Sequence, residues 1–416
     1  MKTALVNISQ LVTCKGSYAK HGKEMSEIGE IKNGCVICDG ETIEAVGTME
    51  ELTQKYDLRQ MNVIDCDGKT VLPGFVDSHT HLVFGGYRAD EFNWRLNGMS
   101  YMDIMLRGGG IQATTNATRE TSKEELKQSA LRRLKSLLQF GVTTVEAKSG
   151  YGLDVENELK QLEVVEEIRP LQPLDIVSTF MGAHSVPPEY KGKEEKFIDY
   201  LVKEALPVVK ERNLAEFCDI FCEDNVFSVE QSRTMLTEAQ KMGFGAKIHA
   251  DEIVTLGGSE LAAEIGCVSA DHLLHASDEG IRALANSQTI ATCLPATAFC
   301  LGEPYANARK MIDSGCAVAV ASDMNPGSCF CESTPLLIAL CTMYMHMTIE
   351  ETITALTING AAALKREKSI GSIEVGKQAD MVILEWPSIN FLPYHTGVNA
   401  VETVVKKGEV VFRRQY

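Results

Sequence analysis

The sequence lacks any apolar run that approaches the ~20 residues needed to cross a membrane as a helix. Its first residues, MKTALVNISQLVTCKG, have neither the long apolar segment nor the small-residue cleavage site of a signal peptide. Internal repeats and low-complexity segments are also missing. We therefore expect a cytoplasmic protein with no membrane partner.

An excess of basic residues is missing too, since 57 Asp and Glu outnumber 40 Lys and Arg and give a formal net charge of -17. An acidic chain repels phosphate backbones, so nucleic acid is not an expected partner. The net charge does not describe a pocket, which can be locally basic. The 416 residues, 44% of them hydrophobic, suffice for a large domain with a sizeable core and a smaller second domain.

A second CxxC pair is missing, although the chain has 13 cysteines. They are odd in number and scattered, several of them in apolar runs such as TIATCLPA, which is typical of buried thiols in a reducing compartment. Cys35 and Cys38 form one CxxC, but a zinc ribbon would need a second pair at similar spacing. We prefer a strand with two apolar thiols, and a metal or redox role is the alternative.

The two ends of the chain share one pattern. Residues 1 to about 66 contain the short β-type runs TALVNI, GCVICDG, TIEAVGT and NVIDCDG, separated by Gly, Asn and Asp. The last 40 or so residues contain ADMVILEW and VETVVKKGEVVF. We predict that residues 1–66 and 367–416 form one composite β-sandwich domain.

Residues 67–366 alternate short apolar runs with helical stretches such as KEELKQSALRRLKSLLQF. The apolar runs are VLPGFVDSHTH, VTTVEAKSG, DIVSTFMGAH, FCDIFCE, GAKIHADE, VSADHLL, TIATCLP and AVAVASD. Eight such β-then-α units predict an α/β fold, a closed (β/α)8 TIM-type barrel. Barrel enzymes carry their chemistry at the C-terminal strand ends, where this sequence places His79, His81, His184, His249, His272 and Asp323.

Four of these residues form a candidate metal site. His79 and His81 lie two apart, so in a strand their imidazoles would face the same side. His249 and Asp323 end other predicted strands. Each residue alone has an ordinary interpretation as a strand-face, core or turn residue. Together, three imidazoles and one carboxylate predict a divalent metal ion with a position open for water. Zinc suits this donor set, and iron is the close alternative.

Two neighbours of these ligands are candidates for proton transfer. Glu252 follows His249 by three residues and could turn back over the metal, although a solvated loop glutamate is the alternative. His272 would donate a proton or polarise a carbonyl, and its alternative is a buried structural histidine. We expect Asp323 to accept a proton from the attacking water. The catalytic hypothesis therefore names Glu252, His272 and Asp323.

The segments VLPGFVDSHTH, KIHADE, SADHL, ASDMNPG and GSIEVGKQADMVIL resemble the amidohydrolase superfamily over nearly the whole chain. The resemblance implies a metallo-barrel and a small β-sandwich built from both chain ends. The longer segments HTHLVFGGYRADEFNWRLNGMSYMDIMLRGGGI, EAKSGYGL and STFMGAHSVPPEY are more narrowly similar to members that hydrolyse 4-imidazolone-5-propanoate to N-formimidoyl-L-glutamate in histidine degradation. By the same analogy the chain would be a homodimer.

The resemblance also implies site residues. The metal, zinc or iron, would be held by His79, His81, His249 and Asp323, and substrate would be contacted by Arg88, Tyr151, His184, Glu252, Asn325, Gly327 and Ser328. The residue pattern agrees for Arg88, because a loop after His81 could cross the pocket and a guanidinium holds a carboxylate tail bidentately. A surface location is the alternative for Arg88 and Tyr151. Residues 325–328 could be a plain β-turn or could offer backbone N–H groups to an anion.

The number of metal ions and the type of reaction are the two remaining questions. Superfamily members with two metals usually bridge them with a lysine on the fourth strand, and FCDIFCED offers none, so we expect one metal ion per subunit. A hydrolytic nucleobase deaminase on the same scaffold is the first alternative, because the spacing from His249 to Glu252 would serve it too. A non-catalytic scaffold is the second, and the complete ligand set argues against it. His21, His346 and His395 receive no role.

Overall fold

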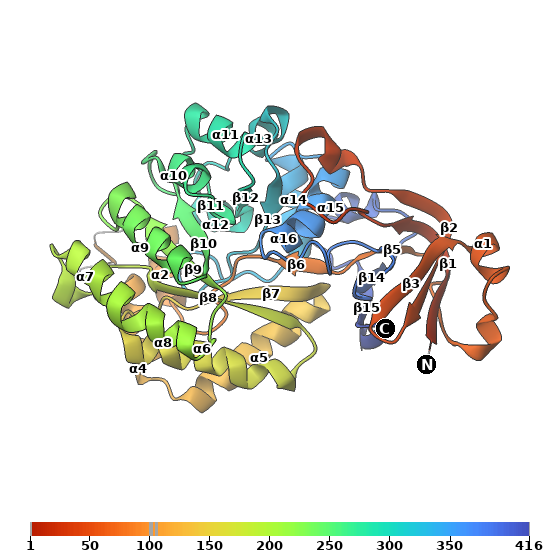
Figure 1. Cartoon of the computed structure of the whole chain (residues 1–416), viewed down its shortest axis with the longest axis horizontal. Coiled ribbons are helices and arrows are strands. Elements are labelled where there is room, and N and C mark those ends of the chain that lie inside the picture. Colours follow the sequence, from red (N-terminus) through yellow and green to blue (C-terminus); the bar gives the residue numbers. More distant parts are fainter. Residues whose placement is uncertain (1, 100–102, 105–106, 416) are drawn as a thin grey trace.

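The computed structural model describes residues 2–99, 103–104 and 107–415. Within these ranges the strands form two sheets, one built from the middle of the chain and one from both ends (Figure 1). The N- and C-terminal markers in Figure 1 both lie beside the second of these sheets. Among the described helices, none combines the length and the apolar character needed to cross a membrane.

The chain-end sheet confirms that both ends of the sequence belong to one β-domain. Hydrogen bonds join the strands in the order β16-β15-β14-β5-β1-β2-β3, with β4 on the edge of β1. Strand β1 runs parallel to β4 and β5 and antiparallel to β2, so the sheet is mixed. Its strands are β1 (Lys2–Val12), β2 (Glu30–Asp39), β3 (Thr42–Thr48), β4 (Asn62–Asp65), β5 (Thr70–Pro73), β14 (Met381–Leu384), β15 (Val401–Lys406) and β16 (Glu409–Arg413).

Alternating apolar residues give this sheet two buried faces. On β2, Cys38 packs with Leu5 in one apolar cluster, and Cys35 packs with Ala4 in another. Side chains of opposite parity along a strand point to opposite faces, which explains the two clusters. Both thiols are free and buried. Cys35 and Cys38 therefore fill the core of the sheet on its two sides, as the strand interpretation expects.

The predicted barrel is confirmed as a sheet of parallel strands that follow one another in chain order from β6 to β13. The barrel closes just beyond its first and last strands, where Asp323 N donates to His79 O at 3.0 Å and His81 N donates to Met324 O at 2.9 Å. The seam is thus made by candidate metal ligands. The strands are β6 (Phe75–Asp77), β7 (Val142–Lys148), β8 (Asp175–Ala183), β9 (Phe217–Cys222), β10 (Gly245–Ala250), β11 (Ser269–His272), β12 (Ile290–Cys293) and β13 (Val318–Val320).

Helices between the strands cover the outside of the barrel (Figure 1). Helix α5, the predicted KEELKQSALRRLKSLLQF helix, begins after Ser122, whose side chain forms a capping box with Glu125. The barrel helices are α2 (Ala89–Leu96), α4 (Ile111–Glu120), α5 (Lys123–Gln139), α6 (Val155–Ile168), α7 (Glu194–Tyr200), α8 (Leu206–Glu211), α9 (Val229–Lys241), α10 (Gly258–Glu264), α11 (Asp278–Ala285), α12 (Pro295–Leu301), α13 (Ala308–Ser314), α14 (Thr334–Met343), α15 (Ile349–Leu356) and α16 (Ile358–Ala362). The chain-end segments add α1 (Met49–Thr53) and α17 (Phe391–Tyr394). The short turns are η1 (Gly22–Ser26), η2 (Leu58–Gln60), η3 (Arg169–Leu171), η4 (Pro188–Tyr190) and the π-helical η5 (Leu201–Ala205).

The chain passes between the two sheets at residue 74 and again between residues 362 and 381, and the exact domain bounds of 1–66 and 367–416 stay predictions. On the N-terminal side, β5 ends at Pro73 in the chain-end sheet and β6 begins at Phe75 in the barrel. On the C-terminal side, α16 ends at Ala362 and the chain-end sheet resumes at Met381. The chain passes directly from the small sheet into the first barrel strand, which leads to the candidate metal ligands.

Candidate active site

A cavity of about 250 Å³ opens at the C-terminal ends of the barrel strands. This volume suits a small molecule rather than a polymer. Nearly all of the predicted site residues line it, namely His81, Arg88, Tyr151, His184, His249, Glu252, His272, Asp323, Asn325, Gly327 and Ser328. His79 lies fully buried beside His249, with 4.5 Å between the ring centroids. The structure therefore brings the predicted metal, catalytic and substrate residues to one place.

A larger hollow of about 560 Å³ lies at the opposite end of the barrel, against the chain-end sheet. Its charged side chains are paired with one another. Arg366 Nη2 lies 2.6 Å from Glu216, and Arg169 Nη2 lies 2.6 Å from Glu166. The hollow contains none of the clustered histidines, so the chemistry belongs to the smaller cavity.

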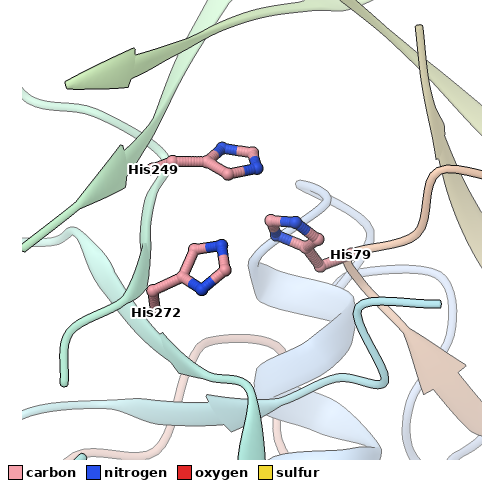
Figure 2. A group of neighbouring side chains, drawn as sticks. All are labelled: His79, His249 and His272. Atoms are coloured by element: carbon pink, nitrogen blue, oxygen red, sulfur yellow. The ribbon is translucent and has the colours of Figure 1, made fainter. Parts of the chain in front are cut away.

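The predicted ligands point toward one another. Figure 2 shows the imidazoles of His79, His249 and His272 converging from three strand ends. The ring centroids of His79 and His81 are 5.6 Å apart. Oδ1 of Asp323 lies 3.5 Å from Nε2 of His79 and 3.9 Å from Nε2 of His81. Potential ligand atoms of His79, His81 and Asp323 lie within 4.8 Å of one another, as do those of His79, His249 and His272.

Each ligand histidine is oriented through its Nδ1 atom. Nδ1 of His79 lies 2.6 Å from Oδ2 of Asp271, and Nδ1 of His249 lies 3.2 Å from Oδ1 of Asp219. A carboxylate can only accept, so in both pairs Nδ1 carries the proton and Nε2 keeps its lone pair. Nδ1 of His81 faces a backbone carbonyl oxygen, at 3.4 Å. All three rings therefore turn Nε2 toward the common point.

The donor set fits a divalent metal ion. Nε2 of His79 and Nε2 of His249 are buried and lack a hydrogen-bond partner among the described residues. Buried polar atoms are rarely left without a partner unless a ligand supplies one. Burial lowers the pKa of His79 and His81, so these imidazoles are neutral, which is the form that binds a metal. Burial raises the pKa of Asp323 to about 6, and a nearby cation would favour its ionised form.

Glu252 and His272 form a second pair beside the metal ligands. Oε2 of Glu252 lies 3.5 Å from Nε2 of His272, and both ring nitrogens of His272 are buried without a hydrogen-bond partner in the described chain. Burial, and then the carboxylates of Asp323 and Glu223, raise the pKa of Glu252 well above its usual value. Burial lowers the pKa of His272. Burial therefore favours the neutral form of both groups at the cavity wall.

Two residues of this group have unusual backbone conformations. His272 has a φ of 79° and Asp323 a φ of 51°. Residues other than glycine rarely adopt positive φ, and such strain concentrates at functional sites. His272 ends β11, Asp323 lies three residues after β13, and both side chains line the cavity.

Arg88 lies inside the cavity and not on the outer surface. It stands at the N-terminal end of α2, with Nη1 3.8 Å from Oε2 of Glu91. Its Nε is buried and has no hydrogen-bond partner among the described residues. Glu91 and Arg95 also line the cavity, and sequence reasoning missed both. Both residues lie on the same helix as Arg88, about one and two turns further along, and this spacing could have identified them from the sequence.

Tyr151 and His184 form an aromatic wall around His81. The His184 ring stacks on His81 with centroids 4.6 Å apart and planes 9° apart. The Tyr151 ring is 2% exposed and lies 5.4 Å from His81, so it is not a surface turn residue. Nδ1 of His184 faces the carbonyl oxygen of Gly150 at 3.0 Å. This contact leaves Nε2 of His184 as the available ring nitrogen.

The turn after β13 favours the plain β-turn among the two alternatives that the sequence left open. The N–H groups of Gly327 and Ser328 donate to Oδ1 of Asn325, at 2.8 and 2.9 Å. They are therefore engaged within the turn and are not free to bind an anion. Asn325 Nδ2 in turn donates to the carbonyl oxygen of Asp323 at 2.8 Å. The turn holds its shape through the Asn325 side chain, which explains why an asparagine follows the metal ligand so closely.

A group of buried charges beneath the histidines was not found from the sequence. Its members lie in strand segments that the sequence analysis interpreted as apolar. All of them are at most 1% exposed: Glu146, Lys148, Asp219, Lys247 and Asp271. The available signal was a charged residue within a short strand, spaced two residues from another polar residue, as in Glu146 with Lys148. Such charges must be paired if the strand is buried.

Comparison with known proteins agrees with this geometry. The family described as the amidohydrolase family matches residues 70–411. The imidazolonepropionase of Clostridium tetani is 57% identical over 99% of this chain and 98% of its own length. That of Porphyromonas gingivalis is 59% identical, also over 99% of this chain and 98% of its own length.

Solved structures at low identity share the fold. A zinc complex of an atrazine chlorohydrolase from Arthrobacter aurescens has a TM-score of 0.72 at 14% identity and covers 99% of this chain and 95% of its own. Guanine deaminase from E. coli has a TM-score of 0.71 at 15% identity and covers 100% of both chains. The barrel, the chain-end sheet and the sequence matches lead to one conclusion. The chain belongs to the amidohydrolase family, and it matches the imidazolonepropionases of that family over nearly its whole length.

Proposed function

We propose that this protein hydrolyses the ring amide bond of 4-imidazolone-5-propanoate and produces N-formimidoyl-L-glutamate, a step of histidine degradation. The names and the high identity of the curated relatives support this reaction. The observation that carries the choice of substrate is Arg88, whose guanidinium lies in the cavity with an unpartnered, buried Nε. A propanoate tail gives that cation a carboxylate to bind.

The proposed cofactor is one Zn²⁺ or Fe ion per subunit, held by His79, His81, His249 and Asp323. The two unpartnered Nε2 atoms and the neutral imidazoles support it. Strand β9 contains no lysine that could bridge two metal ions, which supports a single ion. A divalent cation at this point would supply positive charge that polarises a carbonyl group and makes water more acidic.

The chain's own residues would then move the protons. Asp323 accepts a proton from the water that attacks the ring carbonyl carbon. The N–H of neutral His272 donates to the carbonyl oxygen as negative charge develops on it. Burial raises the pKa of Glu252 and so favours its protonated form, from which the proton passes to the ring nitrogen as the C–N bond breaks. The water oxygen ends in the new carboxylate, and the nitrogen leaves as part of the formimidoyl group.

Substrate orientation would come from the opposite wall of the cavity. Arg88 binds the tail carboxylate, and Tyr151 with His184 forms the face against which the planar ring rests. The turn with Asn325, Gly327 and Ser328 closes the side of the cavity next to Asp323. Fixing the tail and the ring together places the carbonyl carbon near the attacking water, which lowers the entropic part of the barrier.

The alternatives predict different products. A nucleobase deaminase would release ammonia, and a neutral base would offer no carboxylate to the buried Nε of Arg88, which would stay without a hydrogen-bond partner. A non-catalytic scaffold would turn over nothing. The fold does not separate them, since a guanine deaminase shares it.

The test is an assay of the metal-loaded protein with 4-imidazolone-5-propanoate, in which loss of imidazolone absorbance and free ammonia are followed together. Guanine and cytosine serve as rival substrates. We expect turnover of the imidazolone without ammonia. Ammonia from a nucleobase with the imidazolone untouched would support the deaminase, and no turnover of any substrate would support the scaffold.

The expected homodimer and cytoplasmic location stay predictions. A small-molecule substrate follows from the cavity size and the relatives. We propose a dimer only from the family resemblance. Light scattering coupled to size-exclusion chromatography would decide it, with about twice the chain mass of 45.6 kDa as the expected result.

A further inference from the structure

Beneath the candidate metal site, the barrel interior contains a lysine that the proposed reaction does not use. Lys148 ends strand β7, and its side chain is 0% exposed. Its Nζ lies 2.6 Å from Oδ2 of Asp219, 3.0 Å from Oε2 of Glu146 and 3.5 Å from Oδ2 of Asp271. One ammonium group thus contacts three carboxylates in a fully buried interior.

Two of these carboxylates also contact metal ligands. Oδ2 of Asp271 accepts from Nδ1 of His79 at 2.6 Å, and Oδ1 of Asp219 accepts from Nδ1 of His249 at 3.2 Å. The oxygen of Asp271 that faces Lys148 is the same oxygen that accepts from His79. The path from Lys148 to each ligand ring therefore has one carboxylate between two hydrogen-bond donors.

We infer that Lys148 is a positioning residue for the metal, which holds Asp219 and Asp271 in place and through them fixes the ring orientation of His249 and His79. The inference rests on the proposed function, because it assumes that these histidines bind a metal ion. In this proposal, a single side chain aligns two ligand histidines that come from the ends of different strands.

The physical reason is the isolation of the carboxylates. Burial alone would lower the pKa of Lys148, but Asp219, Glu146 and Asp271 together raise it above its usual value, so the side chain stays an ammonium. An ammonium has three N–H donors, which matches the three carboxylates it faces. Without it, Asp219 and Asp271 would lose a fixed partner and could rotate away from the histidines.

The neighbouring lysine does not duplicate this role. Lys247 lies on strand β10 and is also fully buried. Its Nζ bonds Glu146 at 2.7 Å and the carbonyl oxygen of Ser78 at 3.1 Å. The charge of Lys247 also lowers the pKa of Asp271, but Lys148 is the lysine with ion-pair contacts to both carboxylates that orient ligands.

The test compares metal affinity in Lys148→Met and in a matched control. Chain-end Lys406 is also a nearly buried lysine between two carboxylates, at 2.7 Å from Asp380 and 2.8 Å from Asp175, and lies in the other sheet. We expect Lys148→Met to weaken Zn²⁺ binding, measured by competition with a chelator, by roughly 10–100-fold. Lys406→Met should lower thermal stability and leave the Zn²⁺ dissociation constant unchanged.

Two further readouts separate positioning from general destabilisation. Cobalt-loaded Lys148→Met should show altered visible absorption bands, because those bands report the ligand geometry, whereas Lys406→Met should keep the parent spectrum. Lys148→Met and Asp219→Asn should also be non-additive in metal affinity, since both interrupt the same path. If the methionine variant does not fold, Lys148→Gln, which keeps an N–H donor, is measured in the same way.

The outcome distinguishes this inference from the proposed function. Wild-type Zn²⁺ affinity and an unchanged cobalt spectrum in a folded Lys148 variant would overturn the positioning role, even if the parent protein opens the imidazolone. Weakened metal binding with an altered cobalt spectrum would support the role, even if the parent protein proved to act on another substrate.

Discussion

Gly327 provides the space in which the guanidinium of Arg88 lies. A Cβ atom at position 327 would stand 1.1 Å from Nη2 and 2.2 Å from Cζ of Arg88. The loop after the last barrel strand and the loop after the first are thus fitted to each other directly over the cavity. Any side chain at position 327 must displace the arginine.

Gly327→Ala is therefore expected to have the same effect on catalysis as a substitution of Arg88. The clash is with the end of a flexible side chain, so the fold and the metal content should be retained. The displaced guanidinium should lower kcat/KM by at least about tenfold, since a charge-assisted contact is worth roughly 1.5–3 kcal/mol. Steady-state kinetics with 4-imidazolone-5-propanoate would measure the change.

Arg88→Met is the matched control for that variant. It should show a similar loss, and the double variant should lose little more than either single one, because both remove the same contact. Parent-like kinetics of Gly327→Ala, or losses that simply add, would contradict the contact between Arg88 and the substrate tail.

The metal prediction concerns His249, whose unpartnered Nε2 faces the other ligands. Purified protein should contain about one transition metal ion per chain. His249→Ala should lose most of it, and His346→Ala should keep it, because His346 lies outside the cavity residues. Elemental analysis of the three proteins provides the measurement. Two ions per chain, or full occupancy in His249→Ala, would refute the site.

The raised pKa of Glu252 predicts a pH-dependent stability of the metal-free protein. Burial keeps this carboxyl protonated in the folded chain at pH values where the unfolded chain has lost the proton. Folding stability should therefore fall as the pH rises above about 4.3, the usual glutamate value. Glutamine cannot ionise, so Glu252→Gln should escape this fall.

Denaturant unfolding of the two metal-free proteins between about pH 4.5 and 7.5 measures the effect. The stability of Glu252→Gln relative to the parent should increase with pH, at a slope of up to about 1.4 kcal/mol per pH unit. A constant difference across this range would show that Glu252 ionises normally in the folded state.

The barrel and the convergence of the candidate ligands could be predicted from the sequence because both follow from local patterns. Short apolar runs that alternate with amphipathic helices define the strands, and a polar residue at a strand end must lie at the barrel rim. His79 and His81 belong to such an end, and so do His249 and Asp323. Their convergence needed no knowledge of side-chain packing.

The buried charges were missed because their partners come from different strands. Lys148 and Asp219 are far apart in sequence, and only the closed barrel places Nζ 2.6 Å from Oδ2. The two alternatives for the turn of Asn325 stayed open for a similar reason, since its side chain takes the N–H groups that an anion could have used. A local sequence pattern shows neither which distant side chains will pair nor which backbone N–H groups a nearby side chain will occupy.

The most direct test of the proposed hydrolysis is turnover of 4-imidazolone-5-propanoate by the metal-loaded protein in ¹⁸O-labelled water, with mass spectrometry of the product. Attack of water on the ring carbonyl carbon predicts N-formimidoyl-L-glutamate with one ¹⁸O atom, located in the carboxylate formed from that carbonyl, and no ammonia. Glu252→Gln should form this product roughly a hundredfold more slowly, the scale of a positioned acid–base group. A product without the label, or release of ammonia in step with substrate loss, would contradict the account.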